Sequence, residues 1–398
     1  MESIKQIYKI GLGPSSSHTM GPRKAAERFL ERTPGAARYE VTLYGSLAAT
    51  GKGHLTDKAI LDVLNTAAPS EIIWKPEIVL PFHTNGMTFK AFDAEGKESD
   101  SFTAYSIGGG DIVEDGQSRS AGEQVYHMST IRDILNWCTE TGCSFWEYVD
   151  MCEGPEIWDY LRRVWQVMKA AVERGIEAEG VLPGGLGVRR KAFSYHMHAQ
   201  GYNGSLKSRG LVYSYALAVS EENAGGGEIV TAPTCGSCGV LPAVLYHLHT
   251  SKGFSEDRVL RALATAGLFG NVVKCNASVS GAEVGCQGEV GVACAMAAAA
   301  ASQMFGGTTA QIEYSAEMGL EHHLGLTCDP VCGLVQIPCI ERNAYAAARA
   351  LDANLYAAFS DGRHAVDFDR VVQVMKQTGH DIPSLYKETS QGGLAVKK

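Results

Sequence analysis

The chain contains three cysteine-bearing passages in its carboxyl-terminal third: Gly281-Ala-Glu-Val-Gly-Cys286-Gln-Gly-Glu-Val-Gly291, Gly325-Leu-Thr-Cys328-Asp-Pro-Val331 and Val335-Gln-Ile-Pro-Cys339-Ile-Glu-Arg-Asn343. Each cysteine lies close to glycine or proline, where the backbone bends and a side chain can project from a loop or helix end. Cys339 begins a predicted helix, and a helix N-terminus favours the thiolate that binds metal. Three such soft ligands can hold an iron–sulfur cluster with one iron open to substrate. The alternative is buried, inert thiols, because no short paired spacing joins the three.

Composition and length describe a globular protein of two or three domains. The chain has 398 residues, of which 45% are hydrophobic and 20% are charged. Its net charge of −9 argues against nucleic acid as a partner. We expect no membrane partner, because there is no signal-peptide pattern and the most apolar stretch, residues 290–304, is too short to cross a bilayer. The odd count of 11 cysteines lacks the framework of a secreted protein, which predicts a cytoplasmic location with reduced thiols.

The order of secondary-structure signals predicts an α+β chain with a small N-terminal α+β domain and a larger all-α helical domain. Residues 1–115 form the small domain, 116–183 a linker with connecting helices, and 184–398 the helical domain. In the small domain, helices are predicted after Pro22 and at Thr56. The predicted strands are 39–44, 78–81, 87–92 and 101–106. Later helices are predicted at 131–139, 157–176, 211–222, 240–249, 257–274, 289–304, 309–320, 340–359 and 367–378, with a loop-rich passage at 180–203.

A hydroxyl-rich loop precedes the first helix. Its residues Ser15, Ser16, Ser17 and Thr19 are typical of an anion cradle for a carboxylate or phosphate, although simple helix capping explains them equally well. His18 in this loop and His54 in a second glycine-flanked loop are candidate general bases. The alternative is that both histidines are solvated and silent.

Cys235 and Cys238 are separated by two residues, a spacing that suits a redox or metal pair. The passage lacks the strand-to-helix context of a thioredoxin motif, and no second pair completes a zinc site. A tight turn with packed thiols is therefore the favoured interpretation.

Six passages resemble the single-chain form of the bacterial iron–sulfur L-serine dehydratases, also called L-serine ammonia-lyases. Beside the three cysteine-bearing passages these are Gly13-Pro-Ser-Ser-Ser-His-Thr19, Thr231-Ala-Pro-Thr234 and Glu388-Thr-Ser-Gln-Gly-Gly-Leu-Ala395. The resemblance runs nearly end to end. It implies a [4Fe–4S] cluster held by Cys286, Cys328 and Cys339, and active-site histidines corresponding to His18 and His54. It also implies a homodimer.

This chain departs from the family in two ways. Family members carry a further cysteine in a short carboxyl-terminal tail, which is thought to reach back to the open iron, whereas this chain stops at Lys398 without one. Cys235 replaces the more usual asparagine, and Cys332 stands where a small residue is expected. We expect water on the open iron, with Cys235 or Cys332 as alternatives.

The resemblance predicts a cytoplasmic lyase of amino-acid degradation and gluconeogenesis that dehydrates L-serine to pyruvate and ammonia through aminoacrylate. The open iron would activate the β-hydroxyl, His54 would remove the α-proton, and His18 would be the second candidate base or a substrate binder. The loop of residues 15–19 would take the carboxylate. The alternatives are a non-catalytic iron–sulfur sensor, a dehydratase or desulfidase for another small amino acid, a pyridoxal-phosphate enzyme, and a structural zinc protein.

Overall fold

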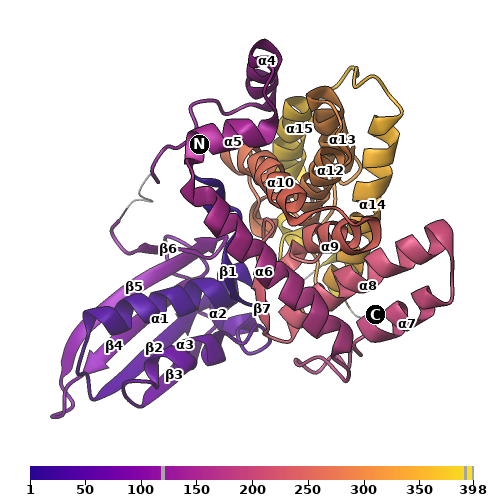
Figure 1. Ribbon diagram of the computed structural model, residues 1–398. Coiled ribbons are helices and arrows are strands. Elements are labelled where there is room, and N and C mark those ends of the chain that lie inside the picture. The colour runs from indigo at the N-terminus through magenta and orange to yellow at the C-terminus, as the bar shows by residue number, and fades with distance from the viewer. Residues whose placement is uncertain (118–121, 390–391, 397–398) are drawn as a thin grey trace.

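The computed structural model describes residues 1–117, 122–389 and 392–396. Within these residues, a five-stranded sheet with its helices lies beside a larger bundle of helices (Figure 1). The α+β class is confirmed, with the small mixed domain preceding the helical one. None of the helices in this part of the chain combines the length and hydropathy that crossing a membrane requires.

The sheet has the strand order β3-β2-β4-β5-β6. Strands β2 and β3 run parallel, and the other neighbours are antiparallel. Along β2 the side chains alternate between buried and half-buried, because one face of the sheet packs against helices. The helices α1 and α3 cover that face around Phe29, Phe89 and Phe102. The bounds are α1 Gly21–Arg32, β2 Arg38–Tyr44, α2 Gly45–Thr50, α3 Thr56–Leu64, β3 Ser70–Lys75, β4 Gly86–Phe92, β5 Glu98–Gly108 and β6 Asp111–Glu114.

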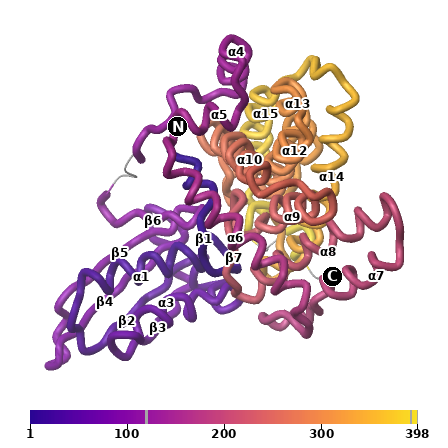
Figure 2. Tube along the Cα trace, viewed as in Figure 1, coloured from indigo at the N-terminus to yellow at the C-terminus, as the bar shows by residue number. Residues whose placement is uncertain are grey.

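The bundle is built around α12, which packs against α9, α10, α13 and α14 (Figure 2). This helix is rich in alanine and is buried on nearly every side. Small side chains let the neighbouring helices approach closely, which explains its lack of a polar face. The bounds are α4 Ile131–Thr141, α5 Phe145–Glu153, α6 Glu156–Glu177, α7 Ala192–Gln200, α8 Gly204–Ala224, α9 Val240–Lys252, α10 Glu256–Asn276, α11 Gly281–Val284, α12 Val292–Phe305, α13 Thr309–Glu321, α14 Cys339–Ala358 and α15 Phe368–Asp381.

The N-terminal segment joins the two parts. Ile4, Ile7 and Tyr8 are buried in the core of the bundle. The chain then forms β1 (Ile10–Leu12), which pairs antiparallel with β7 (Glu228–Val230) before it enters the small domain. The sequence predicts that the helical domain contains no strand. Strand β7 is an exception to that prediction.

Three other local predictions are wrong. Residues 78–81 form no strand; they are a loop with Val79 exposed, and the strand is β3, which sequence reasoning missed. Helix α7 lies in the passage predicted to be loop-rich. Helix α12 begins at Val292 rather than at 289, because residues 287–291 form a wider turn. Strand β6 lies at the end of the predicted small domain, just before the predicted linker, and residues 118–121 of that linker lie outside the described part.

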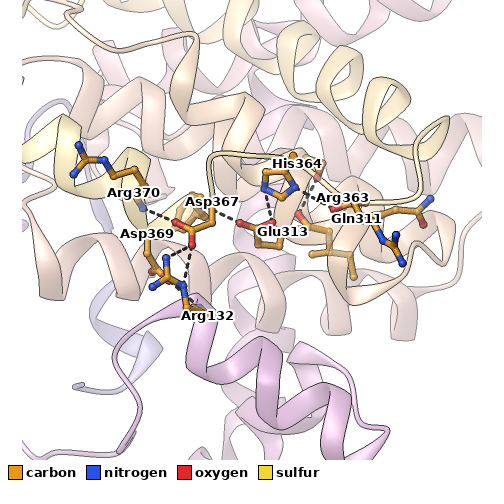
Figure 3. Close-up of polar contacts among 12 residues, drawn as sticks. Arg132, Gln311, Glu313, Arg363, His364, Asp367, Asp369 and Arg370 are labelled. Carbon is orange, nitrogen blue, oxygen red and sulfur yellow. Dashed lines mark hydrogen bonds and ion pairs between the residues drawn. The ribbon is translucent and has the colours of Figure 1, made fainter.

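A polar network fastens α4 to the rest of the bundle (Figure 3). The Asp369 carboxylate accepts hydrogen bonds from the backbone N–H groups of Ile131, at 3.0 Å, and Arg132, at 2.8 Å. The Arg132 guanidinium pairs with Asp367. These N–H groups belong to the first turn of α4 and have no partner inside the helix, so Asp369 caps it from another element.

We expect Asp369→Ala to lower the free energy of unfolding by about 1–3 kcal/mol, because two buried donors would lose their acceptor. Urea denaturation followed by far-ultraviolet circular dichroism measures the change. Arg370→Gln, on the exposed side of the same turn, is the control. Equal stability of the two variants would contradict the capping role.

Candidate active site

A cavity lies between the small domain and the bundle, and both contribute to its walls. One wall carries Ser15, Ser16, Ser17, His18 and His54. The other wall carries all three predicted metal-ligating cysteines, Cys286, Cys328 and Cys339. The structure thus brings together residues that are more than 200 positions apart in the sequence.

The hydroxyl-rich loop forms a single wide turn that leads into α1. The N–H of Met20 donates to the carbonyl of Ser15 at 3.1 Å, and the Ser15 hydroxyl accepts from the N–H of His18 at 3.2 Å. The Ser16 hydroxyl accepts from the N–H of Cys235 in the bundle at 3.0 Å. We call residues 15–20 the serine turn. Its hydroxyls therefore serve both capping and the contact between the domains.

Two threonines brace the histidine loops against each other. The Thr19 hydroxyl donates to the carbonyl of His54 at 2.8 Å, and the Thr56 hydroxyl donates to the carbonyl of His18 at 2.5 Å. Thr19 lies outside the set of residues that line the cavity, so its hydroxyl holds the loop of His54 in place. Thr56 is not the cap of α3 that the sequence predicts; the capping position is Leu55.

The two histidine rings lie with their centroids 4.6 Å apart. Burial and the neighbouring His54 hold the pKa of His18 well below its ordinary value. Burial lowers the pKa of His54 to about 4. Both rings are therefore neutral near pH 7.

The ring nitrogens of the two histidines differ in their partners. His18 has a hydroxyl at each nitrogen, Ser17 Oγ at 2.9 Å from Nδ1 and Ser46 Oγ at 3.0 Å from Nε2. His54 Nδ1 lies 3.2 Å from both the carbonyl oxygen and the hydroxyl oxygen of Thr50. The hydroxyl donates to the Ser46 carbonyl at 3.0 Å, and a carbonyl only accepts, so these contacts favour the proton on Nδ1 of His54. Nε2 then has a lone pair without a hydrogen-bond partner among the described residues.

The thiol wall is withdrawn from water. Burial raises the pKa of Cys286 to about 12 and holds the pKa values of Cys328 and Cys339 well above the ordinary range. The thiols lie close enough that ionising one opposes ionising the others. The Arg342 guanidinium beside Cys286 counters part of that charge. Three thiols on one wall of the cavity, beside the Arg342 guanidinium, suit a metal centre in which one metal atom has no protein ligand. Bound metal would keep the three thiols ionised.

Sequence reasoning missed several residues of the cavity. Glu289 and Glu388 lie beside Cys328, with the ligating atoms of the three within 4.8 Å of one another. Withdrawal from bulk water and the nearby Glu289 raise the pKa of Glu388 to about 8, although its side chain keeps accessible surface. His83 reaches the cavity from the loop after β3. Glu289 and Glu388 both lie in passages that carry the family resemblance. That position is the signal by which the sequence could have identified them.

The other cysteines considered from the sequence lie elsewhere. Cys235 is buried, with its sulfur 3.7 Å from that of Met20. Cys238 is also buried, in the same turn. Cys332 lines a separate cavity with Trp74. Neither Cys235 nor Cys332 is among the residues that line the candidate site.

Two family descriptions match this chain: "Serine dehydratase beta chain" over residues 3–73 and "Serine dehydratase alpha chain" over residues 84–395. An L-serine dehydratase of Streptomyces coelicolor is 43% identical, with 99% of this chain and 98% of the relative covered. L-serine dehydratase 1 of Escherichia coli is 41% identical, with 100% and 99% covered. An L-serine dehydratase of Helicobacter pylori is 37% identical, with 99% and 98% covered.

Proposed function

The chain belongs to the serine dehydratase family of lyases, with the family's β and α parts in one chain, and from this premise we propose that it dehydrates L-serine. Removal of the α-proton and the β-hydroxyl gives aminoacrylate and water. Aminoacrylate rearranges to an imine, which takes up water and yields pyruvate and ammonia. The observation that carries this proposal is a cavity with three thiols on one wall and a neutral histidine with a free nitrogen on the other.

Cys286, Cys328 and Cys339 would hold a [4Fe–4S] cluster. When bound, the cluster supplies a Lewis-acidic iron that stabilises charge on the departing hydroxyl oxygen. The positions of Cys235 and Cys332 outside the cavity lining support the proposal that neither thiol blocks the open iron.

His54 is the proposed base. A general base must be neutral and must have a lone pair that no other group occupies. His54 meets both conditions, because burial keeps it unprotonated and the Thr50 carbonyl fixes the proton on Nδ1. His18 is the weaker candidate, because both its ring nitrogens have hydroxyl partners. We propose that His18 instead orients the neighbouring His54 ring and these two hydroxyls.

The serine turn is the proposed site for the substrate carboxylate. Ser15, Ser16 and Ser17 line the cavity, whereas among the described residues no lysine or arginine does. Hydroxyl and backbone N–H donors at the start of α1 would therefore take the negative charge. The lack of a lining lysine within the described residues also disfavours pyridoxal-phosphate chemistry, which needs a Schiff-base lysine.

Eleven free cysteines support a reducing, cytoplasmic location for this enzyme.

The function is tested by pyruvate formation from L-serine, using protein purified without oxygen and assayed before and after exposure to air. We expect pyruvate formation before exposure to air and its loss as air exposure removes iron from the protein, because the cluster supplies the Lewis acid. Cys286→Ser should lose both iron and activity, whereas Cys332→Ser, outside the cavity, should keep both. Undiminished pyruvate formation by iron-free protein would contradict the proposal.

We expect His54→Ala to lower kcat by about 10²- to 10⁴-fold with unchanged iron content, because a positioned base typically contributes this much. The base works unprotonated, and burial sets its pKa at about 4, so its protonation should not limit kcat/KM at pH 6 or above. A pH–rate profile of the intact enzyme measures this limb. Nearly full activity of His54→Ala would rule out His54 as the base. So would a fall in kcat/KM of the intact enzyme near the ordinary histidine pKa that is absent from His54→Ala.

We also propose a homodimer, formed through an exposed apolar face on α14 and α8. Tyr345 and Tyr356 on α14, and Phe359 directly after it, are 69%, 56% and 86% exposed. The face continues onto α8, where the ring of Tyr213 lies 5.9 Å from that of Tyr345. Large exposed aromatic side chains are typical of interfaces. Sedimentation velocity should show a dimer that Phe359→Ser with Tyr356→Ser weakens; a monomer before mutation would contradict the proposal.

A further inference from the structure

Apart from its histidines and cysteines, the ionisable side chains that line the cavity are all acidic. Among the described residues they are Glu283, Glu289 and Glu388, without a lysine or arginine. Withdrawal from bulk water and the nearby Glu289 raise the pKa of Glu388 to about 8, and a bound cation would oppose that shift by favouring the carboxylate. Burial lowers the pKa values of the three lining histidines, His18, His54 and His83, which are therefore neutral near pH 7. A zwitterionic amino acid brings a cationic ammonium group into this space. The ammonium needs a carboxylate as its partner, because a buried charge without one is costly.

Glu388 is the glutamate that is free to serve. Glu289 already accepts a hydrogen bond from the Thr234 hydroxyl at 2.7 Å. The carboxylate of Glu388 has no hydrogen-bond partner within the part of the chain that the structure describes, and it keeps accessible surface. Glu283 lies on the short helix α11 and belongs also to a neighbouring cavity, so it stands at the edge of the site.

The backbone holds Glu388 in place beside the thiol wall. Its N–H donates to the carbonyl of Cys328 at 2.8 Å, and the N–H of Cys328 donates to the carbonyl of Tyr386 at 2.8 Å. Its φ of +58° is in the left-handed region, which residues other than glycine and asparagine rarely adopt. The pairing with Cys328 maintains this conformation, which leaves the carboxylate within 4.8 Å of the Cys328 sulfur.

Resting on the proposed function, we infer that Glu388 binds the α-ammonium group of the amino-acid substrate. The ammonium and the β-hydroxyl are attached to adjacent carbon atoms of serine. When the β-hydroxyl of serine faces the thiol wall, the ammonium group therefore lies near Cys328. The Glu388 carboxylate beside Cys328 is then close enough to bind it. The serine turn then takes the opposite end, the carboxylate. Glu388 would distinguish amino acids from hydroxy acids of the same shape.

The test compares Glu388→Gln with the wild-type enzyme, both purified without oxygen. The probes are L-serine and 3-hydroxypropanoate, which lacks the ammonium group. We expect KM for L-serine to rise about 10- to 100-fold, because a charge-assisted contact is lost. The inhibition constant of 3-hydroxypropanoate should stay within about twofold of its wild-type value, since the ammonium partner is irrelevant to it. Glu388→Asp, which keeps the charge, should recover part of the affinity.

Glu321→Gln is the matched control, because Glu321 is an exposed residue of α13 that does not line the cavity. It should leave both constants and the iron content unchanged. Iron content and visible absorption of Glu388→Gln should also equal those of the wild type; a loss of iron would make Glu388 a metal ligand and overturn the inference. Equal weakening of both probes, or an unchanged KM, would also overturn it.

Calorimetric titration separates this inference from the proposed function. Binding of 3-hydroxypropanoate can be measured on the wild type, and binding of L-serine can be measured with little turnover at low temperature or in the slow variant His54→Ala. If the wild type forms no pyruvate, the proposed dehydration fails. Tighter binding of L-serine than of 3-hydroxypropanoate, lost in Glu388→Gln, would still establish the ammonium site. Equal binding of the two probes by the wild type would refute it.

Discussion

The site depends on a short set of hydrogen bonds that hold the start of the serine turn against the bundle. The N–H of Gly13 donates to the carbonyl of Gly227 at 3.0 Å, and the Asn223 amide donates to the carbonyl of Pro14 at 3.0 Å. The N–H of Cys235 donates to the Ser16 hydroxyl. These contacts join residues more than 200 positions apart, and the pairing of β1 with β7 fixes the direction from which the chain arrives. These contacts hold the histidine wall opposite the thiol wall.

Burial tunes both walls in the directions that the chemistry needs. It keeps the histidines unprotonated, as a base must be, and it keeps the thiols protonated until metal provides the opposing charge. One physical effect therefore prepares two different groups. Burial of these polar groups is unfavourable unless they have hydrogen-bond partners, and the surrounding residues must provide them. The hydroxyls of Thr19 and Thr56, which brace the histidine loops, show where some of those partners come from.

The sequence predicts the periodic elements well and the position-dependent ones poorly. Long amphipathic helices such as α6, and the alternating strand β2, were readable because one face is buried. The apolar run at 78–81 imitates a strand, whereas α7 has apolar residues on all sides and lacks a helical period. The cysteine set came from the resemblance, because no local spacing joins the three. Glu388 and His83 were missed, because only tertiary contacts bring them to the cavity.

The two walls together determine how a small amino acid would lie. The bundle wall is acidic and the wall of the small domain offers neutral donors, so the ammonium and carboxylate of a zwitterion are drawn to opposite sides. With the β-hydroxyl facing the thiols, three of the four substituents of Cα have fixed directions. In the proposed arrangement the fourth, the hydrogen, would point toward His54 in one enantiomer and away from it in the other. Selectivity for one enantiomer of serine would then follow from the placement of the charges.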